Sequence, residues 1–304
     1  IPRVPATISV AEFVRLFEAP NRPVILEGAA SSWSACELFN IEKLPSASPE
    51  LWKKKVTAGG FRFRLCDFVS YASHFGADDQ PLYVFDRAAL SSPLLSTSYS
   101  PPAPFEASRD TFSLLDGEEE EVECGGEGEG GKQSVRLRPD FKWLIAGGKM
   151  SGSAFHKDPN LTCAWNAVLC GRKRWILYPP RHAPPGVHAS ADGAEVTQPL
   201  SLAEWMMDYY PQTRRPGSPC HAVEAVCGPG DVMFVPRGWW HMALNLDPWV
   251  VAITQNYVPP CAVPAVLHFL RTKPDQVSGV PPLAAPLLHD RLIRNIVTQR
   301  PHLL

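Results

Sequence analysis

The sequence predicts a mainly β fold with added helices (α+β), whose core is a double-stranded β-helix, also called a jelly roll. Short apolar runs alternate with turns of Gly, Pro, Asn and Asp in the second half of the chain. Many short strands separated by such turns are typical of a small barrel or a double-sheet jelly roll. The 32 prolines, about twice the usual share, also suit a turn-rich β protein. The strand-like runs are Thr162–Leu169, Lys173–Tyr178, Val232–Val235, Met242–Leu246 and Trp249–Tyr257.

Residues 1–90 are expected to form an N-terminal α/β portion. Val10–Glu18 has helical spacing of apolar residues, and Ser9 is placed to cap its first turn. Pro23–Leu26 reads as a strand, and Asp67–Phe75 reads as a second helix.

The rest of the chain divides into three parts. Residues 91–135 are expected to be a flexible loop, with disorder over the acidic low-complexity segment Gly117–Lys132. This acidic segment is either simply solvated or placed to attract or compete with a basic substrate tail. The jelly-roll core follows at 136–260, and residues 261–304 form a helical segment that covers one end of the barrel or makes a homodimer contact. Its two helices are predicted at Ala262–Arg271 and Leu287–Gln299.

A His-x-Asp pair, His156 and Asp158, and a distant His241 together offer two imidazoles and one carboxylate. On a strand, residues two apart point to the same face, so His156 and Asp158 can hold one ion while Lys157 points away. Such a set leaves positions open on the metal and is typical of non-haem Fe(II) oxygenases. The simpler alternative is a turn Asp before Pro159 with an unrelated histidine nearby.

Alternation along the strand Lys173–Tyr178 places Lys173, Trp175 and Leu177 on one face. A lysine that points into an apolar barrel needs an anion, because a lone buried charge is very costly. A dicarboxylate such as 2-oxoglutarate would supply one, whereas the alternative is an exposed lysine on an edge strand. Cys170–Arg172, between this strand and the preceding one, reads as a tight hairpin turn.

Further segments complete a recognisable pattern in the right order along residues 8–90 and 140–260. They are Pro81–Asp86, Ala164–Ala167, Gly171–Trp175, Phe234–His241, Leu244–Asp247 and Ala252–Asn256, beside His156, Asp158 and Pro159. With these segments the chain resembles the jumonji-C (JmjC) dioxygenases, which have the cupin architecture and depend on Fe(II) and 2-oxoglutarate. It looks most like the arginine demethylase and lysyl hydroxylase subgroup.

The resemblance implies a site for Fe(II), 2-oxoglutarate and O2. Its implied iron ligands are His156, Asp158 and His241, and its implied co-substrate contacts are Lys173, Asn166, Tyr83, Thr254, Ser153 and Asn256. Ser153 stands where the subgroup has a Thr, so the hydroxyl is kept. Lys157 replaces an apolar residue of the subgroup, with little expected effect because it points away from the iron.

Neighbouring segments are candidates for contacts with the substrate. Arg237, Trp239 and Trp240 precede His241 and either lie near the metal or pack the barrel. The loop 181–200 and the helix-like run Leu202–Tyr210 after it are expected to border the substrate groove.

The implied reaction is oxidation of a protein side chain, by Lys or Arg hydroxylation or by N-methyl-Arg or N-methyl-Lys demethylation. A basic histone-like or splicing-factor tail is the expected substrate, and the nucleus is a more natural location than the cytoplasm. The alternatives are a catalytically silent JmjC interaction module and a metal-binding cupin of other chemistry, such as an isomerase. Retention of every implied ligand and of Lys173 argues against the silent module. A cupin of other chemistry usually has more histidine ligands and does not need Lys173.

Net charge, apolar stretches and cysteine spacing limit the binding partners and environments that the sequence favours. The net charge of −2 gives no global basic field, so bulk attraction to nucleic acid is not implied, although nucleic acid stays open as a partner. No apolar stretch reaches the roughly 18–20 residues that a membrane span needs. The 8 cysteines include no C-x-x-C pair, which favours a reducing, intracellular environment.

Overall fold

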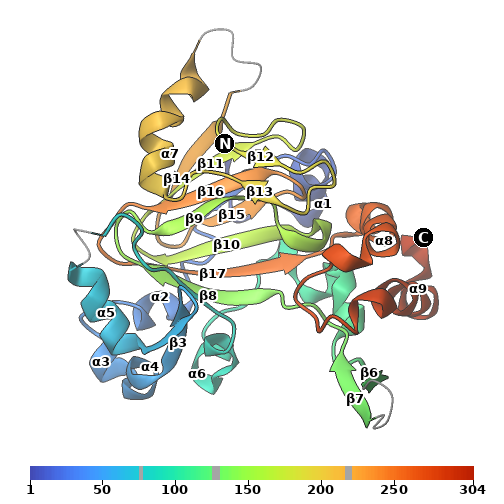
Figure 1. Cartoon of the computed structure of the whole chain (residues 1–304). Helices are drawn as coiled ribbons and strands as arrows, with labels where there is room; N and C mark the ends of the chain where they lie inside the picture. Colours follow the sequence, from blue (N-terminus) through green and yellow to red (C-terminus); the bar gives the residue numbers. More distant parts are fainter. Residues whose placement is uncertain (75–77, 125–130, 216–220) are drawn as a thin grey trace.

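The computed structural model describes residues 1–74, 78–124, 131–215 and 221–304. Two sheets, antiparallel except for one parallel pair at the edge of the larger sheet, face each other as a jelly roll, which confirms the predicted fold class (Figure 1). The larger sheet has nine strands in the order β1-β2-β15-β10-β17-β8-β5-β3-β4, and the smaller has four in the order β14-β11-β16-β9. Boundaries between the four predicted portions of the chain stay predictions.

The strands of the larger sheet are β1 (Arg3–Pro5), β2 (Val24–Glu27), β3 (Lys55–Ala58), β4 (Phe61–Arg64), β5 (Val84–Asp86), β8 (Lys142–Gly147), β10 (Cys163–Cys170), β15 (Val232–Val235) and β17 (Val250–Tyr257). Those of the smaller sheet are β9 (Gly152–His156), β11 (Lys173–Tyr178), β14 (Val223–Cys227) and β16 (Trp240–Asn245). Two short strands, β12 (His188–Ala189) and β13 (Val196–Thr197), pair with each other outside these sheets.

The turn at Cys170–Arg172 is not a hairpin turn, contrary to the sequence prediction. Strand β10 pairs with β15 and β17, whereas β11 pairs with β14 and β16, so the turn carries the chain from one sheet to the other. Gly171 has a φ of +70°, and a Cβ there would meet the Trp249 carbonyl oxygen at 2.4 Å. Only glycine fits this crossing without strain, and the crossing delivers Lys173 to the inner face of the smaller sheet.

The space between the sheets is apolar away from the site. Trp175 and Leu177 of β11 pack there against Met233 and Val235 of β15. On the outer face of the smaller sheet, α7 (Leu202–Asp208) covers Ile176 and Tyr178 through a second apolar cluster. The alternation predicted for β11 is therefore correct, although both of its faces are buried.

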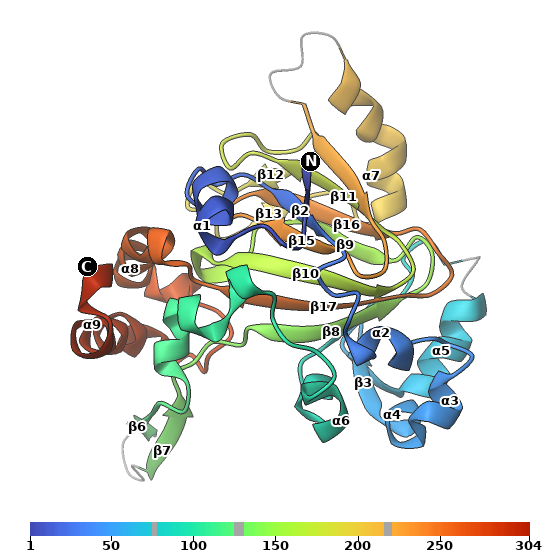
Figure 2. The ribbon, with the colours of Figure 1, turned by 180° about the vertical axis from the view of Figure 1, so that it is seen from behind.

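The N-terminal elements pack on the outer face of the larger sheet (Figure 2). The predicted first helix begins at Val10, and the Ser9 hydroxyl accepts a hydrogen bond from the Glu12 amide as expected. It runs as α1 (Val10–Phe13) and then as a π-helical turn over Val14–Glu18. The second predicted helix is α5 (Leu65–His74), and residue 75 of that prediction lies outside the described residues. The other short helices here are α2 (Ser34–Leu38), α3 (Leu44–Ala47), α4 (Pro49–Lys53) and α6 (Pro93–Ser96).

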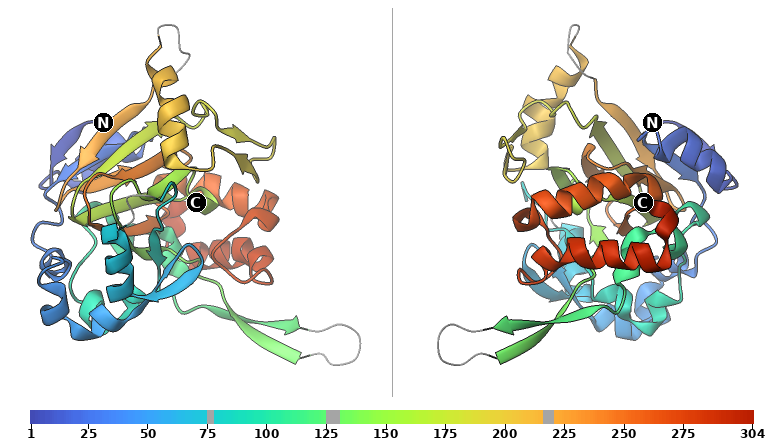
Figure 3. Two further views of the ribbon diagram at one scale, coloured as in Figure 1. Left: turned by 60° about the vertical axis from the view of Figure 1, so that its left-hand side comes forward. Right: turned by 90° about the vertical axis from the view of Figure 1, so that its right-hand side faces the viewer.

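Disorder over Gly117–Lys132 is wrong for the described part of this segment. Strands β6 (Glu119–Cys124) and β7 (Gly131–Arg136) form an antiparallel ribbon that projects from the body of the molecule (Figure 3). Arg291 of the last helix pairs with Glu118 and with Glu120. Composition alone could not reveal this partner, which neutralises part of the acidic run.

The C-terminal segment forms two antiparallel helices at one end of the sheets, α8 (Val263–Thr272) and α9 (Leu288–Gln299) (Figures 1 and 2). Their apolar faces bury Val266 and Leu292 against Phe112 and Leu115, which lie in a short 3₁₀ segment. The apolar faces of both helices are therefore buried within the chain, where the helices cover one end of the barrel. The homodimer contact stays a prediction. Across the described residues, every helix is too short or too polar to cross a bilayer.

Candidate metal centre and co-substrate site

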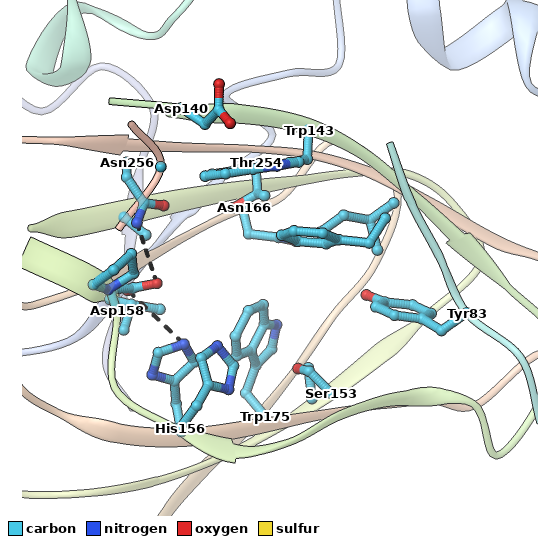
Figure 4. A pocket seen from close by; sticks show the side chains of 18 of the residues that line it. Tyr83, Asp140, Trp143, Ser153, His156, Asp158, Asn166, Trp175, Thr254 and Asn256 are labelled. Atoms are coloured by element: carbon cyan, nitrogen blue, oxygen red, sulfur yellow. Dashed lines mark hydrogen bonds and ion pairs between the residues drawn. The ribbon is translucent and has the colours of Figure 1, made fainter. Parts of the chain in front are cut away.

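A cavity of about 550 Å³ opens between the two sheets. All nine residues that the sequence assigned to the site line this one cavity, although they come from separate strands (Figure 4). They are Tyr83, Ser153, His156, Asp158, Asn166, Lys173, His241, Thr254 and Asn256. The individual roles given to them by resemblance stay predictions, and the geometry below shows what each can do.

His156, Asp158 and His241 form a compact three-residue cluster. Their ligand atoms all lie within 4.8 Å of one another. The two imidazole rings are 4.2 Å apart between centroids, and His241 Nε2 lies 3.8 Å from Asp158 Oδ2. His156 ends β9 and pairs in register with His241 of β16. Asp158 follows the strand in an extended conformation (φ −59°, ψ 142°). Because it is two residues after His156, its side chain lies on the same side as that of His156.

Backbone carbonyls fix the orientation of both imidazoles. His156 Nδ1 lies 2.8 Å from the Ala154 oxygen, and His241 Nδ1 lies 3.0 Å from the Trp239 oxygen. A carbonyl oxygen only accepts, so each Nδ1 carries the proton and donates it. Each Nε2 then keeps its lone pair for a metal, which is the usual arrangement in metal-binding histidines.

The electrostatics of the cluster fit a bound cation. Burial raises the pKa of Asp158 to about 6, and burial together with nearby His156 holds the pKa of His241 well below its usual range. Asp158 Oδ2 is buried without a hydrogen-bond partner, whereas Oδ1 receives only a long contact of 3.5 Å from Asn256 Nδ2. An orphaned carboxylate oxygen beside two imidazole Nε2 atoms is a donor set that suits Fe(II).

Lys173 lies in the same cavity with a side chain that is 1% exposed. It belongs to an inner strand, flanked by β14 and β16, so it is not an exposed lysine on an edge strand. Its Nζ donates to the Tyr83 hydroxyl at 2.9 Å, and burial lowers its pKa to about 7. Within the described ranges no carboxylate lies within 4.0 Å of this amine. An anionic ligand would supply the missing charge.

Asn166 and Thr254 lie opposite each other on β10 and β17. The Thr254 hydroxyl donates to the Trp165 carbonyl at 2.9 Å, which leaves its oxygen free to accept. The Asn166 side-chain oxygen is buried without a partner. Ser153, half-buried, lies on β9 across from Ala243. These groups supply hydrogen-bonding capacity between the metal cluster and Lys173, where a short dicarboxylate would lie.

Several cavity residues were missed from the sequence. Trp143 and Ile145 enter the cavity from β8, and Phe85 stacks on Trp143 with ring centroids 5.0 Å apart. The apolar run Lys142–Gly147 is a detectable signal for this strand. Asp140, just before β8, also lines the cavity, and its turn position gave no such signal.

The aromatic pair before His241 packs the barrel instead of lining the site. Trp239 donates its indole N–H to the Asn21 carbonyl at 2.9 Å, and Trp240 joins the cluster under α7. Lys157 points away from the metal cluster as expected, with its Nζ 4.6 Å from the centre of the Trp240 ring.

Comparison with known proteins agrees with this geometry. The family model described as a Cupin-like domain matches residues 106–262. The chain belongs to the cupin-like JmjC family. It is 39% identical over 269 residues to the arginine-specific demethylase JMJ22 of Arabidopsis thaliana, covering 87% of this chain and 47% of that protein.

Two other relatives in the family carry related names. The bifunctional arginine demethylase and lysyl-hydroxylase psr-1 of Caenorhabditis elegans is 32% identical over 308 residues, which cover 98% of this chain and 68% of that protein. The 2-oxoglutarate and iron-dependent oxygenase JMJD4 of Mus musculus is 31% identical over 135 residues, covering 43% of this chain and 30% of that protein. The chain spans about half the length of JMJ22.

Proposed function

We propose that this chain is an Fe(II)- and 2-oxoglutarate-dependent dioxygenase that oxidises a protein side chain. The observation that carries the proposal is that a His156–Asp158–His241 cluster and the buried amine of Lys173 line the same cavity. The donor atoms of the cluster suit a cation and the buried amine suits an anion, and iron with 2-oxoglutarate would match both. Relatives named for arginine demethylation and lysine hydroxylation support the protein substrate.

The chain's own residues would bind the metal and the co-substrate, orient them, and shield the site from water. His156 and His241 present Nε2 because the Ala154 and Trp239 carbonyls hold their Nδ1 protons. Lys173, whose Nζ donates to the Tyr83 hydroxyl, would hold the carboxylate of the co-substrate that is not bound to the metal. When bound, the iron, 2-oxoglutarate and O2 supply the oxidation of a C–H bond.

Apolar walls keep water away from the reacting atoms. Trp143, Trp175, Ala164 and Val235 line the cavity between its polar ends. The substrate carbon held nearest the metal decides the outcome. An aliphatic carbon gives a stable alcohol, whereas an N-methyl carbon gives a hemiaminal that releases formaldehyde. Hydroxylation and demethylation therefore share one site.

We extend the proposal to arginine or lysine in basic tails, such as those of histones or splicing factors, and to the nucleus as the place of action. Support for the residue type comes from the relatives, whose names specify arginine and lysine.

The test is aerobic turnover of 2-oxoglutarate with Fe(II) and a panel of Arg- and Lys-containing peptides, each with and without N-methyl groups. Mass spectrometry reads the gain of one oxygen atom as hydroxylation and the loss of a methylene unit as demethylation. His156→Ala is the matched inactive control. Bound metal with no succinate under any condition would contradict the proposal and favour a silent interaction module.

A further inference from the structure

The segment that joins α8 to α9 reaches back to the cavity of the proposed active site. Residues 277–280 of this segment are here named the entrance loop. Ser278 and Gly279 of the loop line the same cavity as the metal cluster. Ser278 is also exposed to solvent, so it lies where the cavity opens. The C-terminal helices therefore cover one end of the barrel, and their connection forms part of the cavity wall.

Hydrogen bonds hold the entrance loop on two sides. On one side, Asn160 Nδ2 donates to the Ser278 carbonyl at 2.9 Å, and Asn160 Oδ1 accepts from the Ser278 amide at 3.1 Å. On the other side, the Asp140 amide donates to the Gly279 carbonyl at 2.8 Å. Gly279 has a φ of +82°, and a Cβ there would meet the Asp140 nitrogen at 2.9 Å, so this close approach needs glycine.

Asn160 is well suited to hold the loop. Its φ is +55°, in the left-handed region that asparagine adopts more readily than most residues. Its side chain is buried, and both of its polar atoms bond to the Ser278 backbone. Asn160 follows Asp158 by two residues. The turn that presents the Asp158 carboxylate to the cavity therefore also fixes the entrance loop.

The entrance loop lies at the level of the metal cluster and not at the level of Lys173. Across β11 and β16, Lys173 pairs with Asn245, whereas His241 pairs with Leu177, four residues further along β11. At about 3.4 Å per residue, the two levels are roughly 13 Å apart along the strand. The loop bonds to the turn after Asp158, which Figure 4 shows on the side of the cavity away from Tyr83.

This placement limits the path of a substrate. A co-substrate held by Lys173 and by the metal would fill the part of the cavity between the two levels. A substrate side chain must then reach the metal from the opening, where Ser278 lies. The backbone of the substrate would pass directly beside the entrance loop.

We propose that Ser278 contacts the substrate polypeptide next to the oxidised residue, and that Asn160 is the positioning residue for this contact. The inference rests on the proposed function and adds the C-terminal segment to its substrate-binding surface. The Ser278 hydroxyl can donate to or accept from a peptide group. The two hydrogen bonds of Asn160 keep it in place before the substrate arrives, which lowers the cost of ordering the loop on binding.

Asn160→Gly tests the positioning role. It removes both hydrogen bonds to Ser278 and keeps the left-handed backbone, which glycine adopts freely. Asn21→Gly is the matched control, because Asn21 has a φ of +56° and its Nδ2 donates to the Arg237 carbonyl at 3.1 Å, outside the cavity. The probes are the Arg- and Lys-containing peptides of the turnover panel, carrying a fluorescent label. Anisotropy reports their affinity for protein loaded with Mn(II) and 2-oxoglutarate, so turnover is not needed.

Asn160→Gly should lose about five- to tenfold of its peptide affinity, because binding must then order a loop that two hydrogen bonds hold in wild type. Calorimetry should give affinities for Mn(II) and 2-oxoglutarate close to those of wild type. Hydrogen exchange at the Ser278 amide, which loses its acceptor, should become about fivefold faster. Asn21→Gly should match wild type in all of these measurements.

Ser278→Tyr tests the substrate contact directly and also applies if Asn160→Gly does not fold. The exposed position accepts a ring without disturbing the core, and the ring narrows the opening. Peptide affinity should fall at least as much as in Asn160→Gly, and 2-oxoglutarate affinity should fall less. Ser32→Tyr, in an exposed turn outside the cavity, is its control.

Unchanged peptide affinity in Asn160→Gly or in Ser278→Tyr would overturn the proposal. Unchanged exchange at Ser278 would show that Asn160 does not hold the loop, and a loss of Mn(II) affinity as large as the peptide loss would show that Asn160 acts on Asp158 instead. Wild type that binds and oxidises none of the peptides would contradict the proposed function too. Wild type that oxidises a peptide which Ser278→Tyr binds equally well would overturn the role of the entrance loop alone.

Discussion

Two buried charged clusters in this molecule differ in whether the chain itself completes them. Glu18 is 3% exposed and is fully partnered, with Arg109 Nη2 at 2.6 Å and the Tyr257 hydroxyl donating at 2.9 Å. In the cavity, Asp158 keeps an orphaned oxygen, and Lys173 has one hydroxyl partner and no carboxylate in ion-pair range among the described residues. The first cluster is closed, and the second is open.

This difference indicates a structural role for the closed cluster and a functional role for the open one. Burial raises the pKa of both Glu18 and Asp158, but only Glu18 has a guanidinium beside it that opposes the shift. A buried charge without a partner is strongly destabilising. Open groups that face one cavity are therefore best explained by ligands that arrive from outside, whereas closed groups need none.

The largest expected effect comes from the open cluster. Asp158→Ala should lower 2-oxoglutarate turnover by more than about 100-fold, because even outer-shell partners of a metal are worth 10–100-fold. The fold should persist, since the change removes an unsatisfied buried carboxylate. Succinate release, Fe(II) binding and circular dichroism measure these three outcomes. Unchanged turnover would show that the cluster does not hold the catalytic metal.

The closed cluster should respond in the opposite way. Glu18→Ala leaves Arg109 without its buried partner, so the free energy of unfolding should fall by about 3–5 kcal/mol. Uncoupled 2-oxoglutarate turnover per folded molecule should be retained, because Glu18 does not line the cavity. Urea unfolding measures the loss, with exposed Glu42→Ala as the matched control. Equal stability of the two variants would refute the distinction.

The open cluster was also the more predictable from sequence. His156, Asp158 and Lys173 stand in short motifs whose alternation indicates a shared face, and the structure brings them to one cavity. The closed cluster has no such signal, because Glu18 and Tyr257 are joined only by the way distant segments pack. Its partners depend on tertiary contacts that no local pattern records.

The same limit explains the remaining misses. Asp140 lines the cavity together with residues far from it in sequence. Arg291 and Glu118, which form an ion pair, are also far apart in sequence. The turn at Gly171 was located correctly but its connection was not, because a turn signal does not say which sheet receives the next strand.

The open cluster should also respond to pH through Lys173. Burial lowers its pKa to about 7, and the co-substrate carboxylate needs the charged amine. Below pH 7 the amine is already protonated, whereas above it binding must take up a proton, so affinity should fall by up to about tenfold per pH unit. Calorimetry of 2-oxoglutarate with the Mn(II)-loaded protein between pH 7 and 9 measures this.

Lys173→Met keeps the buried volume and removes the charge, and it should bind the co-substrate weakly at every pH in that range. A wild-type affinity that does not change with pH would contradict the assignment of Lys173 to the carboxylate.

The smallest expected effect is at Asn256, whose side-chain amide makes a weak contact with Asp158 of the open cluster. Asn256 Nδ2 contacts Asp158 Oδ1 at 3.5 Å and the Thr162 hydroxyl at 3.0 Å. Asn256→Ala should lower Fe(II) affinity by about tenfold, the low end for an outer-shell partner, because the contact to the carboxylate is long. Thr162→Val, which frees Asn256 without removing it, should cost less, and metal titration distinguishes the two. A larger loss in Thr162→Val would mean that the hydroxyl, and not the amide, positions the carboxylate.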